Sequence, residues 1–177
     1  MIPIVRAALV KGTVTLPADH IIKEIESLGK ELSIAIDTRF GRSFHIREVD
    51  TGSCGACESE IIALTNPLYD IQRFGVDIVA SPRHADALLV TGPVSRNMAA
   101  ALKDTFDAMA SPKWVITCGN CALDGGLFRN SYYVLGGVGS VLPVDAHIHG
   151  CPPKPIEIIK TLLSLIKSPG TPHCNKT

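Results

Sequence analysis

The chain has 177 residues, with 17 basic Lys and Arg side chains balanced by 17 acidic Asp and Glu side chains. This length suits one compact domain, and a neutral balance without a basic block excludes a nucleic-acid surface built on clustered Lys and Arg. Charged residues make up only 19% of the chain, against roughly 25% in average soluble domains, which indicates a surface partly covered by partners. No apolar run approaches the roughly 18 to 20 residues of a spanning helix, and the first residues do not resemble a signal peptide. We therefore expect a soluble or peripheral cytoplasmic protein.

Segment 1–43 is predicted to be an N-terminal extension with one amphipathic helix. The sequence Leu16-Pro17-Ala18-Asp19 is typical of a helix start, and apolar residues then recur at helical spacing as far as Gly41, at Ile21, Ile25, Leu28 and Leu32. Such a stripe does not identify what it packs against. Its own domain, a neighbouring subunit and a membrane surface are three alternatives.

Segment 44–168 is predicted to be an α/β domain, followed by a tail at 169–177. Short apolar runs predict strands at 45–49, 76–80, 87–91, 114–117 and 141–148, and helical periodicity predicts helices at 58–64, 98–109 and 156–166. Runs that are apolar on both faces suit a buried parallel sheet. The predicted fold class is therefore α/β: an open, mainly parallel, flavodoxin-like sheet with helices on both faces. Binding sites in such sheets form at the carboxyl ends of the strands.

Six cysteines in a cytosolic chain are typical of metal ligands or redox groups rather than disulfides. Five of them follow the ends of predicted strands: Cys54, Cys57, Cys118, Cys121 and Cys151. Four thiolates can complete an iron-sulfur cubane, because soft sulfur ligands suit iron. A zinc site made of the two Cys-x-x-Cys pairs is an alternative, but 60 residues separate the pairs, against roughly 15 to 20 in zinc ribbons. A thioredoxin-like dithiol would leave Cys151 and one pair unexplained.

Six motifs occur in one order between about residues 49 and 166: GSCGACESEI (52–61), SPRHAD (81–86), VTGPV (90–94), GNCA (119–122) with GG (125–126), PVD (143–145) and GCPPKP (150–155). With them the chain resembles the small subunit of the membrane-bound, complex I-related [NiFe] hydrogenases, the group 4 enzymes of the formate hydrogenlyase and energy-converting type. It resembles more distantly the B, or PSST, subunit of complex I. Complex I subunits carry adjacent cysteines at the first ligand pair, so the spaced pair Cys54 and Cys57 favours the hydrogenase branch.

The resemblance implies one [4Fe-4S] cluster on Cys54, Cys57, Cys121 and Cys151. It places the third ligand on the cysteine before Ala and the paired glycines, and the fourth on the cysteine of Gly-Cys-Pro-Pro. Cys118 departs from the family pattern. We interpret it as a small buried hydrophobe, with an alternative ligand as the second interpretation. Cys174 lies beyond the matching region, and we expect an exposed, idle thiol there.

Three further residues are expected beside the cluster. A cubane with four thiolates carries net negative charge, so nearby cations and hydrogen-bond donors tune its potential. Arg83 and His84 of the second motif are the candidates for that role. Glu58 follows a ligand directly, and it could relay protons or hydrogen-bond a helix N-terminus.

The function implied by the resemblance is electron transfer inside a membrane-associated multisubunit oxidoreductase. The chain is not catalytic alone. Implied partners are a large catalytic subunit of hydrogenase or complex I type, a ferredoxin-like iron-sulfur subunit and antiporter-like membrane subunits, with this chain peripheral on the cytoplasmic side. Nickel ligands would belong to the large subunit. The alternatives are a subunit of a complex I-type quinone oxidoreductase and a structural zinc-binding assembly module.

Overall fold

The computed structural model describes residues 18–168, which form one sheet of five strands in the order β2-β1-β3-β4-β5. All neighbouring strands pair in parallel. The strands are β1 (Phe44–Asp50), β2 (Val76–Ile78), β3 (Ala87–Thr91), β4 (Trp114–Cys118) and β5 (Ala146–Ile148). This is the 2-1-3-4-5 order of flavodoxin-like sheets, so the predicted fold class is confirmed. The expected helix start at Leu16 and Pro17, and the tail with Cys174, lie outside the described residues.

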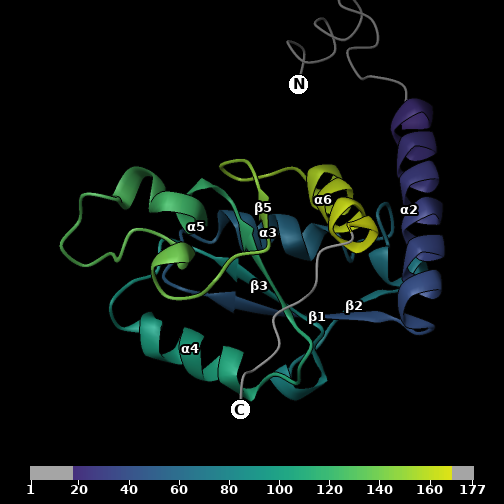
Figure 1. Cartoon of the computed structure of the whole chain (residues 1–177). Helices are drawn as coiled ribbons and strands as arrows, with labels where there is room; N and C mark the ends of the chain where they lie inside the picture. The colour runs from purple at the N-terminus through teal and green to yellow at the C-terminus, as the bar shows by residue number, and fades with distance from the viewer. Residues whose placement is uncertain (1–17, 169–177) are drawn as a thin grey trace, which may run out of the picture.

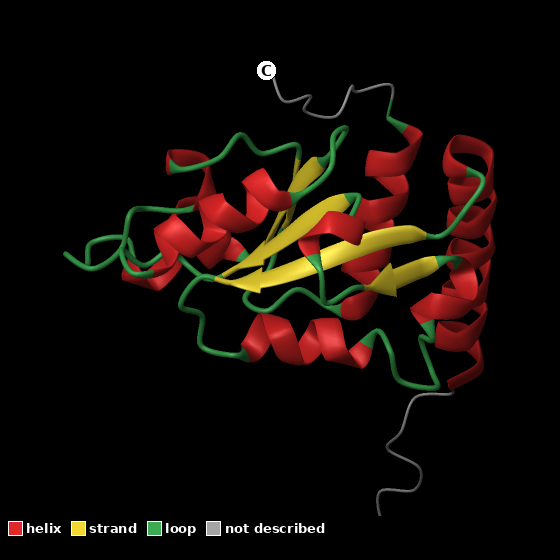
Figure 2. Ribbon diagram, turned by 90° about the horizontal axis from the view of Figure 1, so that it is seen from below, coloured by secondary structure: helices red, strands yellow, loops and turns green. Residues whose placement is uncertain are grey.

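Helices cover both faces of the sheet (Figures 1 and 2). One face packs against α2 (Ala18–Phe40), α3 (Ala56–Ala63) and α6 (Pro155–Lys167), and the other against α4 (Met98–Ala108) and the short α5 (Asn120–Asp124). The central strand β3 is buried throughout. Because side chains alternate along a strand, Leu89 joins the core under α6 while Leu88 and Val90 join the core under α4.

The described part of the amphipathic helix packs on its own domain. Leu32 and Ile36 of α2 are buried in the same apolar cluster as Leu162 of α6. Arg39 fastens the two helices further, because its Nη1 donates to the carbonyls of Ile166 and Ser168 at 2.6 and 2.8 Å. Of the three alternatives for the stripe, the structure shows the intramolecular one.

β5 is shorter than the predicted strand at 141–148. The chain before it forms a 3-10 turn, η4 (Val138–Ser140), and then reaches Pro143, which has no N–H to offer a sheet. Sheet contact resumes at Asp145, whose N–H donates to the carbonyl of Val115 at 2.9 Å and whose Oδ2 accepts from the N–H of Val115 at 2.7 Å. The last strand therefore begins at Ala146.

Candidate metal centre

Four cysteines line one pocket beyond the carboxyl ends of β1, β4 and β5. They are Cys54, Cys57, Cys121 and Cys151, and the pocket holds about 340 Å³ of empty space, part of it open to solvent. Cys54 and Cys151 are exposed at its mouth, whereas Cys57 and Cys121 are half-buried. Cys118 does not line this pocket. The structure thus brings together the four cysteines that the resemblance selects.

The loop after β1 is shaped by short hydrogen bonds within the chain. Oδ1 of Asp50 accepts the N–H groups of Gly52 and Ser53 at 2.8 and 2.7 Å, and Oγ of Ser53 accepts the N–H of Gly55 at 3.0 Å. Gly55 then turns the backbone with a φ of 83° directly before α3, a conformation that glycine adopts without steric cost. This turn places Cys54 just ahead of the helix and Cys57 within its first turn.

Thr51 ties the same loop to the loop after β3. Its Oγ1 donates to the carbonyl of Thr91 at 2.6 Å and accepts the N–H of Val94 at 3.1 Å, and its side chain is fully buried. Gly92 follows at a φ of 81°, and a Cβ there would lie 2.8 Å from the backbone nitrogen of Ser53. The two loops therefore touch backbone to backbone beside the pocket.

The loops after β4 and β5 are joined by a reciprocal pair of hydrogen bonds. The N–H of Asn120 donates to the carbonyl of Gly150 at 2.8 Å, and Oδ1 of Asn120 accepts the N–H of Gly150 at 3.1 Å. The next residue along each loop is a cysteine, Cys121 in one and Cys151 in the other. Cys121 lies in α5, because residues 120–124 close one helical turn immediately after Gly119.

Two glycines leave room for sulfur at the floor of the site. A Cβ on Gly119 would lie 2.6 Å from Sγ of Cys57, and a Cβ on Gly126 would lie 2.9 Å from Sγ of Cys121. Both have positive φ, 85° and 51°. Side chains at positions 119 and 126 would therefore occupy the space that the sulfur atoms of Cys57 and Cys121 fill. We call this arrangement the glycine cradle.

The electrostatics of Cys121 reflect this convergence of sulfurs. Burial raises the pKa of Cys121, and negative charge on Cys151, Cys57 and Cys54 raises it further. Four thiolates at one place repel each other, and bound metal offsets that repulsion by coordinating the deprotonated sulfurs. The donor set and the glycine cradle fit an iron-sulfur cluster. Within residues 18–168, no three His, Cys, Asp or Glu side chains are grouped so as to hold a single metal ion.

Cys118 lies beneath the pocket as the last residue of β4, and it is fully buried, as predicted. Its thiol interacts with that of Cys57. This interaction lowers the pKa of Cys57, whereas the same interaction and then burial raise the pKa of Cys118 above its ordinary value.

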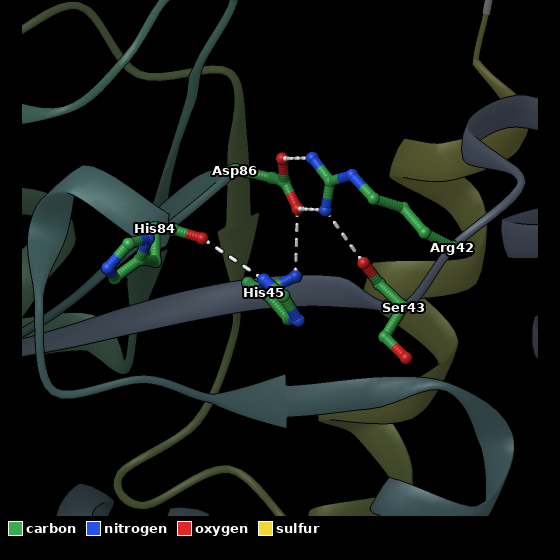
Figure 3. A network of polar contacts seen from close by, with 5 residues as sticks. All are labelled: Arg42, Ser43, His45, His84 and Asp86. Carbon is green, nitrogen blue, oxygen red and sulfur yellow. Dashed lines mark hydrogen bonds and ion pairs between the residues drawn. The ribbon is translucent and has the colours of Figure 1, made fainter.

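Arg83 and His84 do not reach this edge of the sheet, contrary to expectation. β2 ends at Ile78 opposite Ile46, early in β1, so the chain turns back near the amino end of the sheet. There the carbonyl of His84 lies 3.1 Å from Nδ1 of His45 (Figure 3). The cysteines follow the opposite, carboxyl end of β1, so closeness of Arg83 and His84 to them is not observed.

The amino end of the sheet is instead held by an ion pair. Arg42 and Asp86 form two parallel hydrogen bonds at 2.9 and 2.5 Å, and Oδ2 of Asp86 also accepts the N–H of His45 at 2.9 Å (Figure 3). Asp86 thereby links the residues just before β1 and β3. This network explains the Asp of the Ser-Pro-Arg-His-Ala-Asp motif as structural.

Glu58 lies beside the cysteines with both carboxylate oxygens buried, and they accept no hydrogen bond from the described residues. Of the two roles considered for Glu58, the hydrogen bond to a helix N-terminus is not formed among the described residues, and the proton relay stays a prediction. The charge of Glu58 acts on Glu48 of β1, whose pKa is raised by burial first and by this charge second. Oγ1 of Thr91 donates to Glu48 at 3.3 Å. The charges of both carboxylates also act on Cys118, whose pKa they raise after the larger effects of Cys57 and burial.

Thr51 and Asn120 were not anticipated from the sequence. Hydroxyl and amide side chains after strands are typical of local loop contacts, which is a signal at both positions. Their partners, Thr91 and Gly150, lie 40 and 30 residues away in the chain. Only the order of the strands brings these loops together.

Apolar side chains are exposed next to the pocket. Leu127 is 89% and Tyr132 86% exposed, and Leu123, Phe128 and Tyr133 are also exposed. Phe128 lines the cysteine pocket, and Leu123 and Leu127 line a neighbouring hollow together with Cys121 and Cys151. An apolar surface therefore borders the candidate centre. Among the helices of residues 18–168, none combines the length and the apolar character needed to cross a membrane.

Fold and site together define a flavodoxin-like α/β protein with a cysteine-lined pocket at the carboxyl ends of its strands. Residues 54–165 match the family described as NADH ubiquinone oxidoreductase, 20 Kd subunit. The chain belongs to this family.

Three relatives represent the oxidoreductase complexes in which the family occurs. Formate hydrogenlyase subunit 7 of Escherichia coli K12 is 46% identical over 64% of this chain and 45% of its own length. The probable membrane-bound hydrogenase subunit mbhJ of Pyrococcus furiosus is 44% identical over 67% of this chain and 71% of its own. The B subunit of the NADH-quinone oxidoreductase of Bacteroides fragilis is 40% identical over 77% of this chain and 71% of its own. These relatives confirm the resemblance to both branches.

Two solved structures share the fold. A chain of the membrane-bound sulfane sulfur reductase, an archaeal respiratory membrane complex, is 29% identical with a TM-score of 0.63, over 77% of this chain and 76% of that one. A chain of an NAD⁺-reducing [NiFe]-hydrogenase is 17% identical with a TM-score of 0.54, over 76% of this chain and 97% of that one. The second likeness concerns the fold alone.

Proposed function

We propose that this chain is the electron-transferring small subunit of a membrane-associated oxidoreductase complex, with one [4Fe-4S] cluster on Cys54, Cys57, Cys121 and Cys151. The observation that carries the proposal is the convergence of these four thiols, from three loops, on one pocket. A bound cluster supplies one-electron redox chemistry.

The remaining residues of the site hold the ligands in place and limit water. Asp50, Thr51 and Asn120 fix the loops through hydrogen bonds, so the thiols are positioned before metal arrives. The apolar side chains of Pro93, Phe128 and Pro152 line the walls of the pocket. This environment favours electron transfer, because excluding water reduces the solvent reorganisation that each change of charge requires and protects the centre from oxygen.

The large catalytic subunit is proposed to dock on an exposed apolar surface. This docking surface consists of Leu123, Leu127, Phe128, Tyr132 and Tyr133. Monomeric proteins seldom leave such side chains together in water, and these border the pocket. Electron exchange needs neighbouring cofactors close together, so the partner belongs at this edge. A ferredoxin-like iron-sulfur subunit and antiporter-like membrane subunits complete the proposed complex, with this chain peripheral on the cytoplasmic side.

We favour a hydrogenase-type complex over a complex I-type one because of the first ligand pair. Cys54 and Cys57 are separated by Gly55 and Ala56, and the turn at Gly55 lets both face the pocket. The relative from the NADH-quinone oxidoreductase of Bacteroides fragilis fits the same electron-transfer role in the alternative complex.

Single cysteine substitutions in the anaerobically purified complex test the ligand set. Cys121→Ala should leave a three-iron or empty site, whereas Cys118→Ala should keep four irons per chain and a paramagnetic signal on reduction. The opposite pair of results would refute the assignment of the third ligand. Expression of the chain without its partners tests the proposed docking surface. The isolated chain should precipitate or lose iron rapidly, and a stable, cluster-loaded monomer in air would contradict the proposal.

A further inference from the structure

We propose that Cys118 is a positioning residue that donates an S–H···S hydrogen bond to the sulfur of Cys57 and thereby raises the reduction potential of the centre. The inference rests on the proposed function, because Cys57 has to be a cluster ligand. It gives a role to the one described cysteine that does not line the pocket.

The position of Cys118 follows from the sheet. It ends β4, where it pairs with Thr91 of β3, and its side chain points to the same face as Trp114 and Ile116, the face that α3 and α6 cover. Cys57 lies in the first turn of α3 and packs against the same apolar cluster. The two thiols therefore share the buried face beneath α3, where they interact.

Close packing keeps this contact in place. Cys118 is 0% exposed, so no water competes for its proton. The next residue is Gly119, and a Cβ there would approach Sγ of Cys57 to 2.6 Å. The sulfur of Cys57 is thus confined between α3 and the end of β4, with the thiol of Cys118 as its buried neighbour.

Chemistry decides which sulfur donates. A thiolate that ligates metal carries no proton and can only accept. Cys118 lies outside the proposed ligand set and keeps its proton, so the bond runs from Cys118 to Cys57. A donor to a ligand sulfur stabilises the more negative, reduced state more than the oxidised state, and a dry, low-dielectric setting strengthens the effect. Cys118 should therefore make reduction easier without touching the metal.

The test is a redox titration of the whole anaerobic complex, followed by the paramagnetic signal of the reduced centre. Cys118→Ala should shift the midpoint potential to a more negative value while four irons per chain are retained. Cys118→Ser keeps a donor and should restore part of the shift. Ile116→Val is the matched control: it removes a similar volume from the same buried face of β4 and no hydrogen bond, so it should leave the potential unchanged.

A second readout identifies the proton itself. After exchange into D₂O during unfolding and reconstitution, pulsed paramagnetic resonance should detect a deuteron coupled to the centre in the unsubstituted protein and in Cys118→Ser. The coupling should be absent in Cys118→Ala.

Each contrary outcome has a distinct meaning. If Cys118→Ala keeps four irons and an unchanged potential, or shifts only as far as Ile116→Val, the hydrogen-bond role is refuted and the proposed function stands. If Cys118→Ala loses iron, Cys118 is a ligand and the inference is also wrong. An unsubstituted complex without iron in this chain would refute the proposed function itself.

Discussion

Replacing Thr51 by Val should destabilise the fold and loosen the loop that carries Cys54. The change keeps the shape of the side chain but removes two hydrogen bonds at a fully buried position. The carbonyl of Thr91 still accepts the N–H of residue 51 at 2.9 Å, so this loss costs about 1 kcal/mol. Within residues 18–168, the N–H of Val94 has no other hydrogen bond to replace the one to Thr51, and an orphaned buried donor costs roughly 1 to 3 kcal/mol. The expected total is about 2 to 4 kcal/mol.

Pulse proteolysis over a urea series, read on this chain in the purified complex, measures the change. Thr161→Val is the matched control, because its hydroxyl bonds an exposed helix carbonyl at 2.9 Å, and it should change stability by less than about 0.5 kcal/mol. Thr51→Ser retains the hydroxyl and should recover most of the loss. In Thr51→Val a chelator should also remove iron faster. A stability within about 0.5 kcal/mol of the unsubstituted chain would refute this account of the loop.

Three further substitutions address separate parts of the molecule. Glu48→Gln should stabilise the chain near pH 8. Burial raises the folded-state pKa of Glu48 above its ordinary 4.5, so the unsubstituted chain loses stability as pH rises from 4.5 through the raised value. Below about pH 4.5 the melting curves of the two chains should converge. Gly119→Ala should lower iron content, because its Cβ would meet the sulfur of Cys57; Gly136→Ala, at a similar positive φ of 87° but with open space around it, should retain iron, and equal iron in both variants would contradict the cradle. Asp86→Ala should lower the free energy of unfolding by about 2 kcal/mol, because the N–H of His45 loses its acceptor. Urea unfolding should show a smaller loss when the half-exposed Arg42 is replaced instead.

Much of the fold was predictable because the strands are buried on both faces and the helices are amphipathic. The runs at 87–91 and 114–117 match β3 and β4 within one residue. The predicted strand at 141–148 was too long, since Val141 and Leu142 are apolar for another reason: they pack from a turn into the core under α4 and α5. Hydrophobic runs indicate burial, and burial does not require a strand.

The gathering of the cysteines was predictable for the same reason that the sheet was. Residues after the carboxyl ends of parallel strands share one edge, so Cys54, Cys57, Cys121 and Cys151 had to lie near each other. Arg83 and His84 were predicted to lie beside the cysteines, but β2 ends earlier than predicted, opposite Ile46 near the start of β1. Because β2 is short, the chain that follows it stays near the amino end of the sheet, away from the cysteines. A local sequence pattern does not define strand length well.

The contact between Cys118 and Cys57 illustrates a further limit. Alternation along β4 indicates that residue 118 points to the face of residues 114 and 116. That it meets Cys57 depends on where α3 starts and how α3 lies on the sheet. Those are long-range packing features, and no spacing in the sequence encodes them.

Metal and sulfide analysis of the complex, purified without oxygen, tests the central proposal most directly. The account predicts about four irons and four acid-labile sulfides for the cluster of this chain, after subtraction of a parallel preparation carrying Cys121→Ala. It also predicts a paramagnetic signal on reduction that this substitution removes. A colourless preparation with stoichiometric zinc bound to this chain, and neither iron nor sulfide, would contradict it.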